Sequence, residues 1–287
     1  MKNSFNFEND IITSRQNPFI LYVCKLSEKK HRQKEKKLRL DGIKLFAEAV
    51  ESGVEIEHAL IAEGAKEKII EKLGDFLTNA TANGCEIKIV SDGVFEKISE
   101  EKSPEGIICI AKYIDKFHKI ATINSEEDFF KKIFSEDNSV FALESIRDPG
   151  NLGTIIRSAV AFGVDYILLS SDCADIYNPK TIRAAMGTLF KQKIIIVDDM
   201  AHALELLSGC GRKVYAAALS KDAVLLGKCE ISPRDCIVVG NEGHGLSENI
   251  ISTSNERLLI PMTSGAESLN AAIASSVCLW EQFGRNL

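Results

Sequence analysis

Six short apolar segments after residue 138 constrain the fold of this chain most strongly. They are rich in Val, Ile, Leu and Ala, helical stretches separate them, and they read VFALES, YILLS, KIIIV, KVYAAAL, DCIVVG and RLLIP. Strands that are apolar on both faces are typical of a parallel sheet covered by helices on each side. The sequence therefore predicts an α/β domain with a mostly parallel sheet over residues 136–287.

The first part of the chain shows a similar alternation on a smaller scale. The strand-like segments LRLDG, IEHALIAE, EIKIVSD and EGIICIAKY are separated by helical ones. This pattern predicts a small α/β domain over residues 1–113. Residues 114–135 are mixed in charge and lack a strand signal, so we expect them to form a linker with one short helix.

Composition excludes several classes of protein. Of the 287 residues, 45% are apolar and 26% are charged, as in ordinary globular proteins. No uninterrupted apolar run reaches the roughly 20 residues of a membrane span, and the opening MKNSFNFENDIITSRQNP does not resemble a signal peptide. We therefore expect a cytoplasmic protein with no membrane partner. The eight cysteines are scattered without a C-x-x-C pair, which predicts mostly buried thiols and no metal site.

The charge distribution is uneven. The net charge is −6, yet KLSEKKHRQKEKKLR, residues 25–39, carries eight lysines and arginines against two glutamates. Such a segment is compatible with a solvated helix face and with RNA contact.

Three loops that follow predicted strands hold unusual polar residues, at the sheet edge where α/β folds bind ligands. In the first, RDPGNLG, Asn151 is suited to cap the following helix. Arg157 follows among apolar residues, where a guanidinium needs an anionic partner. That partner is either a ligand phosphate or a structural carboxylate such as Asp148 or Glu144.

The second loop, VVGNEGHGL, places Glu242 directly after a strand, among glycines that let a ligand approach the backbone. A solvated glutamate in a glycine-rich turn is the alternative, and His244 is expected to face solvent.

The third loop is LLIPMTSGAESLNAAIASSVCLW. Ser268 is expected to cap a long final helix whose apolar stripe holds Leu269, Ile273, Val277 and Trp280. Asn270 carries donors and acceptors that a helix start does not require.

Together, D-P-x-N-x-G-x-x-x-R, G-N-E-x-x-G-L and I-P-M with E-S-L-N resemble the signature motifs of the SpoU/TrmH family of the SPOUT superfamily. Members transfer a methyl group from S-adenosylmethionine to a ribose 2′-hydroxyl in RNA. The segments ITSRQNP and SPEGIICIA resemble the RNA-binding domain that precedes the catalytic domain in rRNA-directed members. One departure is Ala185, where the family usually has serine, which leaves the choice of substrate open.

The resemblance implies a C-terminal trefoil knot, a homodimer and two sets of site residues. The implied catalytic residues are Arg157, Asn151, Glu242, Ser268 and Asn270, and the implied cofactor-binding residues are Gly240, Ile260 and Leu269. Arg157 is sometimes proposed as the base in the family, but phosphate clamping and alkoxide stabilisation suit a guanidinium better.

Three other functions are considered beside methylation of rRNA. With 23S rRNA favoured as the substrate, the alternatives are a tRNA methyltransferase of the same family and a non-catalytic RNA-binding protein with this fold. A nucleotide-dependent enzyme is disfavoured because dinucleotide and P-loop fingerprints are absent from the sequence.

Overall fold

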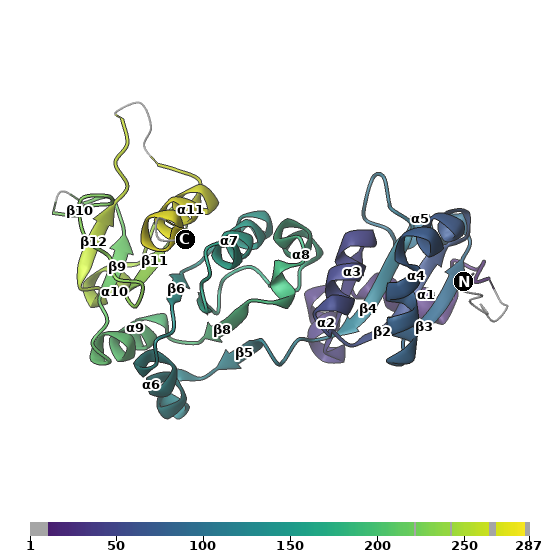
Figure 1. The fold of residues 1–287 in the computed structure, drawn as a ribbon, viewed down its shortest axis with the longest axis horizontal. Coiled ribbons are helices and arrows are strands. Elements are labelled where there is room, and N and C mark those ends of the chain that lie inside the picture. Colours follow the sequence, from purple (N-terminus) through teal and green to yellow (C-terminus); the bar gives the residue numbers. More distant parts are fainter. Residues whose placement is uncertain (1–10, 221, 242, 264–267, 285–287) are drawn as a thin grey trace. The chain divides into compact units, whose positions relative to one another are not determined.

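The structure of the protein is a computed structural model that describes residues 11–220, 222–241, 243–263 and 268–284. The chain forms two compact units (Figure 1). The first contains residues 1–114 and 177–190, and the second contains residues 115–176 and 191–287. Within the described ranges, no helix is long and apolar enough to cross a membrane.

A four-stranded sheet forms the centre of the first unit, in the order β1-β4-β2-β3. β4 pairs antiparallel with β1 and β2, and β2 pairs parallel with β3. All four strands expected from the sequence are present. They are β1 (Lys37–Asp41), β2 (Ile56–Ala62), β3 (Glu86–Val90) and β4 (Ile107–Lys112).

Helices cover both faces of this sheet. Ile108 and Ile110 of β4 join a buried cluster with α1 and α5, so Cys109 between them points to the opposite face. Helices α3 and α4 pack against each other and against the strands, and α8 contacts β1. The helices of this unit are α1 (Pro18–Lys25), α2 (Lys29–Glu35), α3 (Ile43–Glu51), α4 (Lys66–Ala82), α5 (Asp92–Ile98) and α8 (Pro179–Ala185).

The second unit contains an eight-stranded sheet in the order β10-β12-β9-β11-β6-β7-β8-β5. Every neighbouring pair in it is parallel, which confirms the predicted fold class. The strands are β5 (His118–Ala121), β6 (Val140–Leu143), β7 (Tyr166–Ser170), β8 (Lys193–Val197), β9 (Val214–Ala217), β10 (Val224–Leu225), β11 (Cys236–Val239) and β12 (Glu256–Leu259).

The sequence analysis identified six of these strands and missed two. The two missed strands, β5 and β10, are the edges of the sheet. Edge strands are less buried than central ones, and Ile120 of β5 is 74% exposed. The expectation of no strand between residues 114 and 135 is therefore wrong, because an edge strand need not carry the continuous apolar pattern of a central one.

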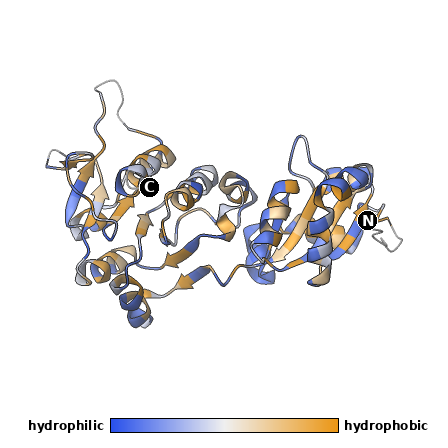
Figure 2. Ribbon diagram, viewed as in Figure 1, coloured by the Kyte–Doolittle hydropathy of each residue, from blue (hydrophilic) through white to orange (hydrophobic). Residues whose placement is uncertain are grey.

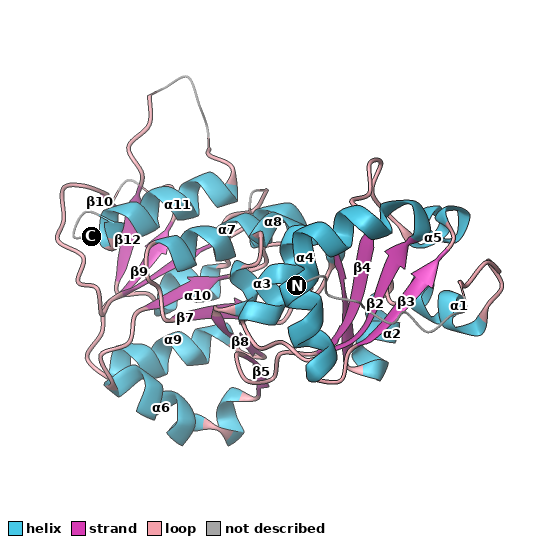
Figure 3. Cartoon of the chain, turned by 45° about the vertical axis from the view of Figure 1, so that its right-hand side comes forward, coloured by secondary structure: helices cyan, strands magenta, loops and turns pink. Residues whose placement is uncertain are grey.

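Helices lie on both faces of this sheet as well, and the apolar strands are sandwiched between them (Figures 2 and 3). A buried cluster joins α6, α9 and α10 to alternate residues of the central strands. Helices α7 and α11 pack against each other, and α11 packs on β11. These helices are α6 (Glu127–Ser135), α7 (Pro149–Ala161), α9 (Met200–Gly209), α10 (Glu248–Thr253) and α11 (Ala271–Gln282).

The cysteines behave mostly as small apolar side chains, as predicted. All eight are free thiols, and five of them are buried. Burial raises the pKa of Cys236 and Cys278 to about 12, so these thiols stay protonated at neutral pH.

The connection between β12 and α11 includes residues 264–267, which lie outside the described residues. The trefoil knot expected in this part of the chain therefore stays a prediction.

Candidate active site

A pocket of about 510 Å³ lies at the carboxyl ends of three neighbouring strands, β12, β9 and β11. Because these strands are parallel, the loops that follow them meet at one edge of the sheet. The start of α11 closes part of the pocket. Its larger apolar lining side chains include Leu219, Leu246, Ile251, Ile260, Met262 and Leu269.

The structure places Gly240, Ile260 and Leu269 together in the wall of this pocket. These are the three residues that the sequence assigned to cofactor binding. Ser268 lines the same pocket and is exposed. His244, which was expected to face solvent, is exposed and also forms part of the wall.

Position 240 must be glycine because the backbone of residues 245 and 246 comes too close to leave room for a side chain. A Cβ at this position would lie 2.4 Å from the carbonyl oxygen of Gly245 and 2.6 Å from the amide nitrogen of Leu246. The backbone of Asn241 exchanges two hydrogen bonds with that of Gly245, at 3.1 and 2.9 Å, which folds the loop back on itself. A residue larger than glycine at position 240 would push this loop away from the pocket.

Asn241 ties two of the three motif loops together. Its side-chain amide donates a hydrogen bond of 2.9 Å to the carbonyl oxygen of Ser145, in the loop after β6. Its side-chain oxygen accepts one of 2.8 Å from the amide of Gly243. Asn241 was not among the predicted site residues, although its position in the G-N-E motif marks it.

Ser145 has a left-handed backbone with φ of 56°, which is uncommon for a residue other than glycine. Its hydroxyl donates to Asp172 at 2.5 Å, and its amide donates to Ser170 at 2.9 Å. Burial acts to raise the pKa of Asp172, but hydrogen bonds from Ser145 and Ser170 outweigh it and lower the pKa. The carboxylate therefore helps to hold the strained turn after β6.

Two predicted catalytic residues meet directly. The side-chain amide of Asn270 donates a hydrogen bond of 3.0 Å to the side-chain oxygen of Asn151. This contact joins the starts of α7 and α11. Further along the same helices, the hydroxyls of Ser158 and Ser276 are 2.8 Å apart.

The helix caps differ from the sequence expectation. Asp148, not Asn151, caps α7, because its carboxylate accepts a 2.8 Å hydrogen bond from the amide of Asn151. Asn270, not Ser268, caps α11, and its side-chain oxygen accepts from the amides of Ala272 and Ile273 at 2.9 and 3.3 Å. Each helix starts at the residue whose side-chain oxygen reaches the free amides of the first turn.

Arg157 is exposed on α7, one turn beyond Gly153. No hydrogen bond or ion pair joins it to another residue in the part of the chain that the structure describes. Glu144 instead accepts hydrogen bonds from the amide and the hydroxyl of Ser247, at 2.8 and 2.6 Å. The expectation of a desolvated arginine is therefore wrong, since the helix turns this side chain toward solvent, and neither proposed carboxylate partner binds it.

The apolar stripe expected on the last helix is not buried. Ile273 and Trp280 are each 52% exposed, and Val277 is 36% exposed. The buried face of α11 is formed by smaller or polar residues, including Ala271, Ala272, Ser275, Cys278, Leu279 and Gln282. Hydrophobic periodicity identified the helix and its stripe of larger apolar side chains, and the structure shows that three of these side chains are partly exposed.

Glu242 lies outside the described residues, so the structure does not place this side chain. Within the described ranges, no group of three or more His, Cys, Asp or Glu is arranged to hold a metal ion. Ala185 is buried at the end of α8, where the backbone turns left-handed at Met186.

Comparison with known proteins defines the class to which this fold and pocket belong. The SpoU rRNA Methylase family matches residues 138–280, and the MRM3-like substrate binding domain matches residues 17–109. Together the two matches cover most of the chain. The protein is therefore an α/β RNA methyltransferase whose first part is similar to a substrate-binding domain. It belongs to the SpoU/TrmH family, as the motifs indicated.

Individual relatives span nearly the whole chain. The 23S rRNA guanosine 2′-O-methyltransferase RlmP of Bacillus subtilis is 28% identical over 95% of this chain and 99% of its own length. An uncharacterised tRNA/rRNA methyltransferase of Synechocystis is 29% identical over 94% of this chain and 92% of its own. The crystal structure of an AdoMet-bound rRNA methyltransferase from Sinorhizobium meliloti matches with a TM-score of 0.81 and 26% identity, over 97% of this chain and 98% of that one.

Proposed function

We propose that this protein transfers the methyl group of S-adenosylmethionine to a ribose 2′-hydroxyl of ribosomal RNA, with 23S rRNA as the favoured substrate. The observation that carries the proposal is the pocket in which Gly240, Ile260 and Leu269 lie together, in a chain of the SpoU/TrmH family. Full-length relatives that act on 23S rRNA support the choice of RNA.

The pocket residues fit an adenosine-containing cofactor. Apolar side chains such as Leu246, Ile260 and Leu269 suit a purine ring, and the absence of a side chain at Gly240 lets the loop backbone come close. When bound, S-adenosylmethionine supplies an activated methyl group on a sulfonium centre. We assign Gly240, Ile260 and Leu269 to holding it.

We assign Arg157 to the RNA. An exposed guanidinium with no carboxylate partner among the described residues suits phosphate recognition by two parallel hydrogen bonds. It also suits stabilisation of the charge that develops on the ribose oxygen. Because a guanidinium keeps its proton far above neutral pH, we do not assign it the role of base.

The four remaining residues that the motifs assign to catalysis are proposed to orient the ribose. Asn151 and Asn270 are joined by their hydrogen bond, which fixes the start of α7, the helix that carries Arg157. Ser268 lines the pocket, and Glu242 lies between the lining residues Asn241 and Gly243 in the chain. We propose that all four contribute by positioning, from which most catalysis of this reaction can come.

We also propose a homodimer. Ile273, Val277 and Trp280 form a stripe of exposed apolar side chains on α11, three or four residues apart. The stripe begins three residues after Asn270, so a second copy packed here would approach the candidate site. Burial of such a stripe in a protomer interface removes its apolar surface from water.

Residues 1–113, which form most of the first unit, are proposed to bind the RNA substrate. Residues 114–135 are proposed as a linker and residues 136–287 as the catalytic domain. The match to a substrate-binding domain and the basic segment at residues 25–39 support this division. A cytoplasmic location stays a prediction.

The direct test is methyl incorporation from labelled S-adenosylmethionine into total RNA from cells that lack this protein. Ribose methylation is then mapped on rRNA and tRNA separately. Incorporation into rRNA at a site unmethylated in those cells is expected. Incorporation only into tRNA would support the tRNA alternative, and incorporation into neither would favour a non-catalytic RNA-binding protein.

A further inference from the structure

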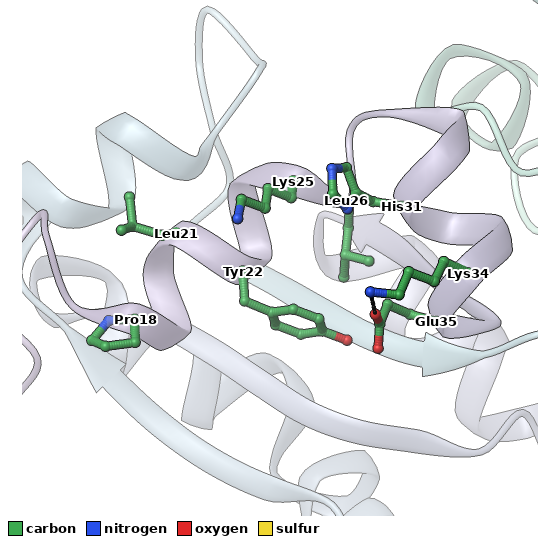
Figure 4. A pocket seen from close by; sticks show the side chains of 8 residues that line it. All are labelled: Pro18, Leu21, Tyr22, Lys25, Leu26, His31, Lys34 and Glu35. Carbon is green, nitrogen blue, oxygen red and sulfur yellow. Dashed lines mark ion pairs between the residues drawn. The ribbon is translucent and has the colours of Figure 1, made fainter.

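A second pocket, of about 350 Å³, lies between α1 and α2 of the first unit, entirely within the basic segment and the helix before it. Its volume is at the lower end of the roughly 300–1,000 Å³ range of small-molecule sites. Figure 4 shows its lining side chains, which come from both helices. They are Pro18, Leu21, Tyr22, Lys25, Leu26, His31, Lys34 and Glu35.

Some cations of the basic segment are buried and bind other parts of the protein, whereas others are exposed to solvent. Arg32 is 1% exposed and donates to the carbonyl oxygens of Leu26 and Ser27, which fixes α2 against the end of α1. Arg39 is 2% exposed and binds Asp41 through two hydrogen bonds. These two cations cannot reach a ligand. The exposed cations of the segment are Lys25, Lys29, Lys30, Lys34 and Lys36.

Two of those exposed lysines line the pocket. Lys25 comes from the last turn of α1 and Lys34 from the last turn of α2. Among the described residues, Lys34 has a single charge partner, Glu35, at a long distance of 3.9 Å, and its side chain is 77% exposed. Both ammonium groups are therefore free to bind an external anion such as a phosphate.

The pocket also offers an aromatic ring and an acceptor. The ring of Tyr22 extends from α1 toward Glu35 of α2 (Figure 4). The Tyr22 hydroxyl is buried beside Lys37, whose ammonium lies 5.9 Å from the ring centre. The carboxylate of Glu35 accepts hydrogen bonds but donates none. Binding of a simple anion would require the lysines but neither the aromatic ring nor the carboxylate.

We propose that this pocket binds one unpaired nucleotide of the RNA substrate, with a base that presents an imino and an amino donor side by side, as guanine does. The base stacks on Tyr22, as unpaired bases do on aromatic side chains. The two carboxylate oxygens of Glu35 accept hydrogen bonds from the adjacent N1–H and N2–H groups of guanine, whereas uracil presents a single N3–H between two carbonyl oxygens that the carboxylate repels. Lys25 and Lys34 bind the adjoining phosphates. This inference rests on the proposed RNA substrate and assigns the first unit a base preference of its own.

The test uses the full-length protein and fluorescently labelled short oligouridylates, with or without one central guanosine, in an anisotropy assay. The wild type is expected to bind the guanosine-containing probe at least about fivefold more tightly, the scale of one stacked and hydrogen-bonded base. Tyr22→Leu should weaken that binding at least about fivefold. Glu35→Gln should bring the affinities for the two probes together without loss of binding.

Charge variants provide the matched control. Lys25→Gln with Lys34→Gln removes two lysines of the pocket, and Lys29→Gln with Lys30→Gln removes two exposed lysines of α2 that do not line it. Both pairs should reduce the salt dependence of binding. The first pair should weaken the binding of both probes more than the second pair does and should leave the guanosine preference unchanged, because phosphate contacts carry no base information.

Equal affinity of the wild-type protein for the two probes overturns the proposal. So does an unchanged guanosine preference in folded Tyr22→Leu and Glu35→Gln variants, with folding checked by circular dichroism. Methyl incorporation into rRNA is measured with the same preparations. Its absence in the wild type, with guanosine preference intact, would reject the proposed reaction and leave the nucleotide pocket standing.

Discussion

Asn270 and Asn151 are 119 positions apart in the chain, yet their side chains share a 3.0 Å hydrogen bond. Asn270 caps α11, and Asn151 lies in the first turn of α7. One short polar contact therefore connects the helix that carries Arg157 to the helix whose start closes the pocket.

Asn270 allows its two roles to be separated. Asn270→Ala removes both the cap and the link to Asn151, and should lower the free energy of unfolding by about 1 kcal/mol. Asn270→Ser keeps a capping oxygen, but its side chain is too short to reach Asn151. We expect methyl transfer to fall roughly tenfold or more in both variants, because the link sets the position of α7. Full activity of Asn270→Ser in a single-turnover assay would show that the link has no part in positioning.

Arg157→Ala should keep the fold and the binding of S-adenosylmethionine, because the side chain is exposed and lies outside the pocket wall. Methyl transfer should fall at least about 100-fold, the scale of losing one preorganised charged donor. Arg157→Lys is the matched variant. It keeps the charge but loses the planar fork, so it should recover only part of the activity. Turnover like that of the wild type in Arg157→Ala would reject the assignment.

Gly240→Ala should weaken S-adenosylmethionine binding by roughly tenfold or more, since its Cβ would overlap backbone atoms of Gly245 and Leu246. Calorimetric titration measures this directly. Gly209→Ala, at the exposed end of α9 with no atom near the added Cβ, is the control and should bind normally. A Gly240→Ala variant that binds as tightly as the wild type would place the cofactor elsewhere.

The exposed stripe on α11 predicts a dimer that a single charge disrupts. Ile273→Glu should convert the protein to a folded monomer, as measured by light scattering, because a carboxylate in an apolar interface is strongly disfavoured. Ile120→Glu, at a more exposed isoleucine on the edge strand β5, should leave the mass unchanged. A monomeric wild type, or a dimeric Ile273→Glu variant, would contradict the proposal.

The lowered pKa of Asp172 predicts that the stability of the protein depends on pH. Its pKa in the folded protein is lowered, because hydrogen bonds from Ser145 and Ser170 outweigh burial, so its carboxylate stabilises the fold above the unfolded value of about 3.9. That contribution is lost as the pH falls through the folded pKa. The Tm of Asp172→Asn should therefore lie below that of the wild type at neutral pH and converge with it below about pH 4.

Asp75→Asn, which removes an exposed carboxylate of α4, is the control and should follow the wild type throughout. A difference between Asp172→Asn and the wild type that stays constant down to pH 3 would exclude this carboxylate as the cause.

The central strands were predictable because their residues are apolar on both faces, and burial on both faces leaves that mark in the sequence. The edge strands β5 and β10 could not be predicted in this way, because a strand at the edge of a sheet is less buried and has a weaker apolar sequence pattern. The pocket residues Gly240, Ile260 and Leu269 were identified through the motifs. Local periodicity could not have brought them together, because they come from different segments of the chain.

The amino-acid sequence by itself determined the parallel α/β architecture, the family and the order of the three motif loops. Only the tertiary structure decided that Asn270 meets Asn151, that Arg157 faces solvent and that Ile273 and Trp280 lie on the outer face of α11. The physical reason is that hydrophobic periodicity locates the apolar stripe of a helix but not the surface against which the stripe packs. Which side turns inward depends on the register and packing of segments far apart in the chain.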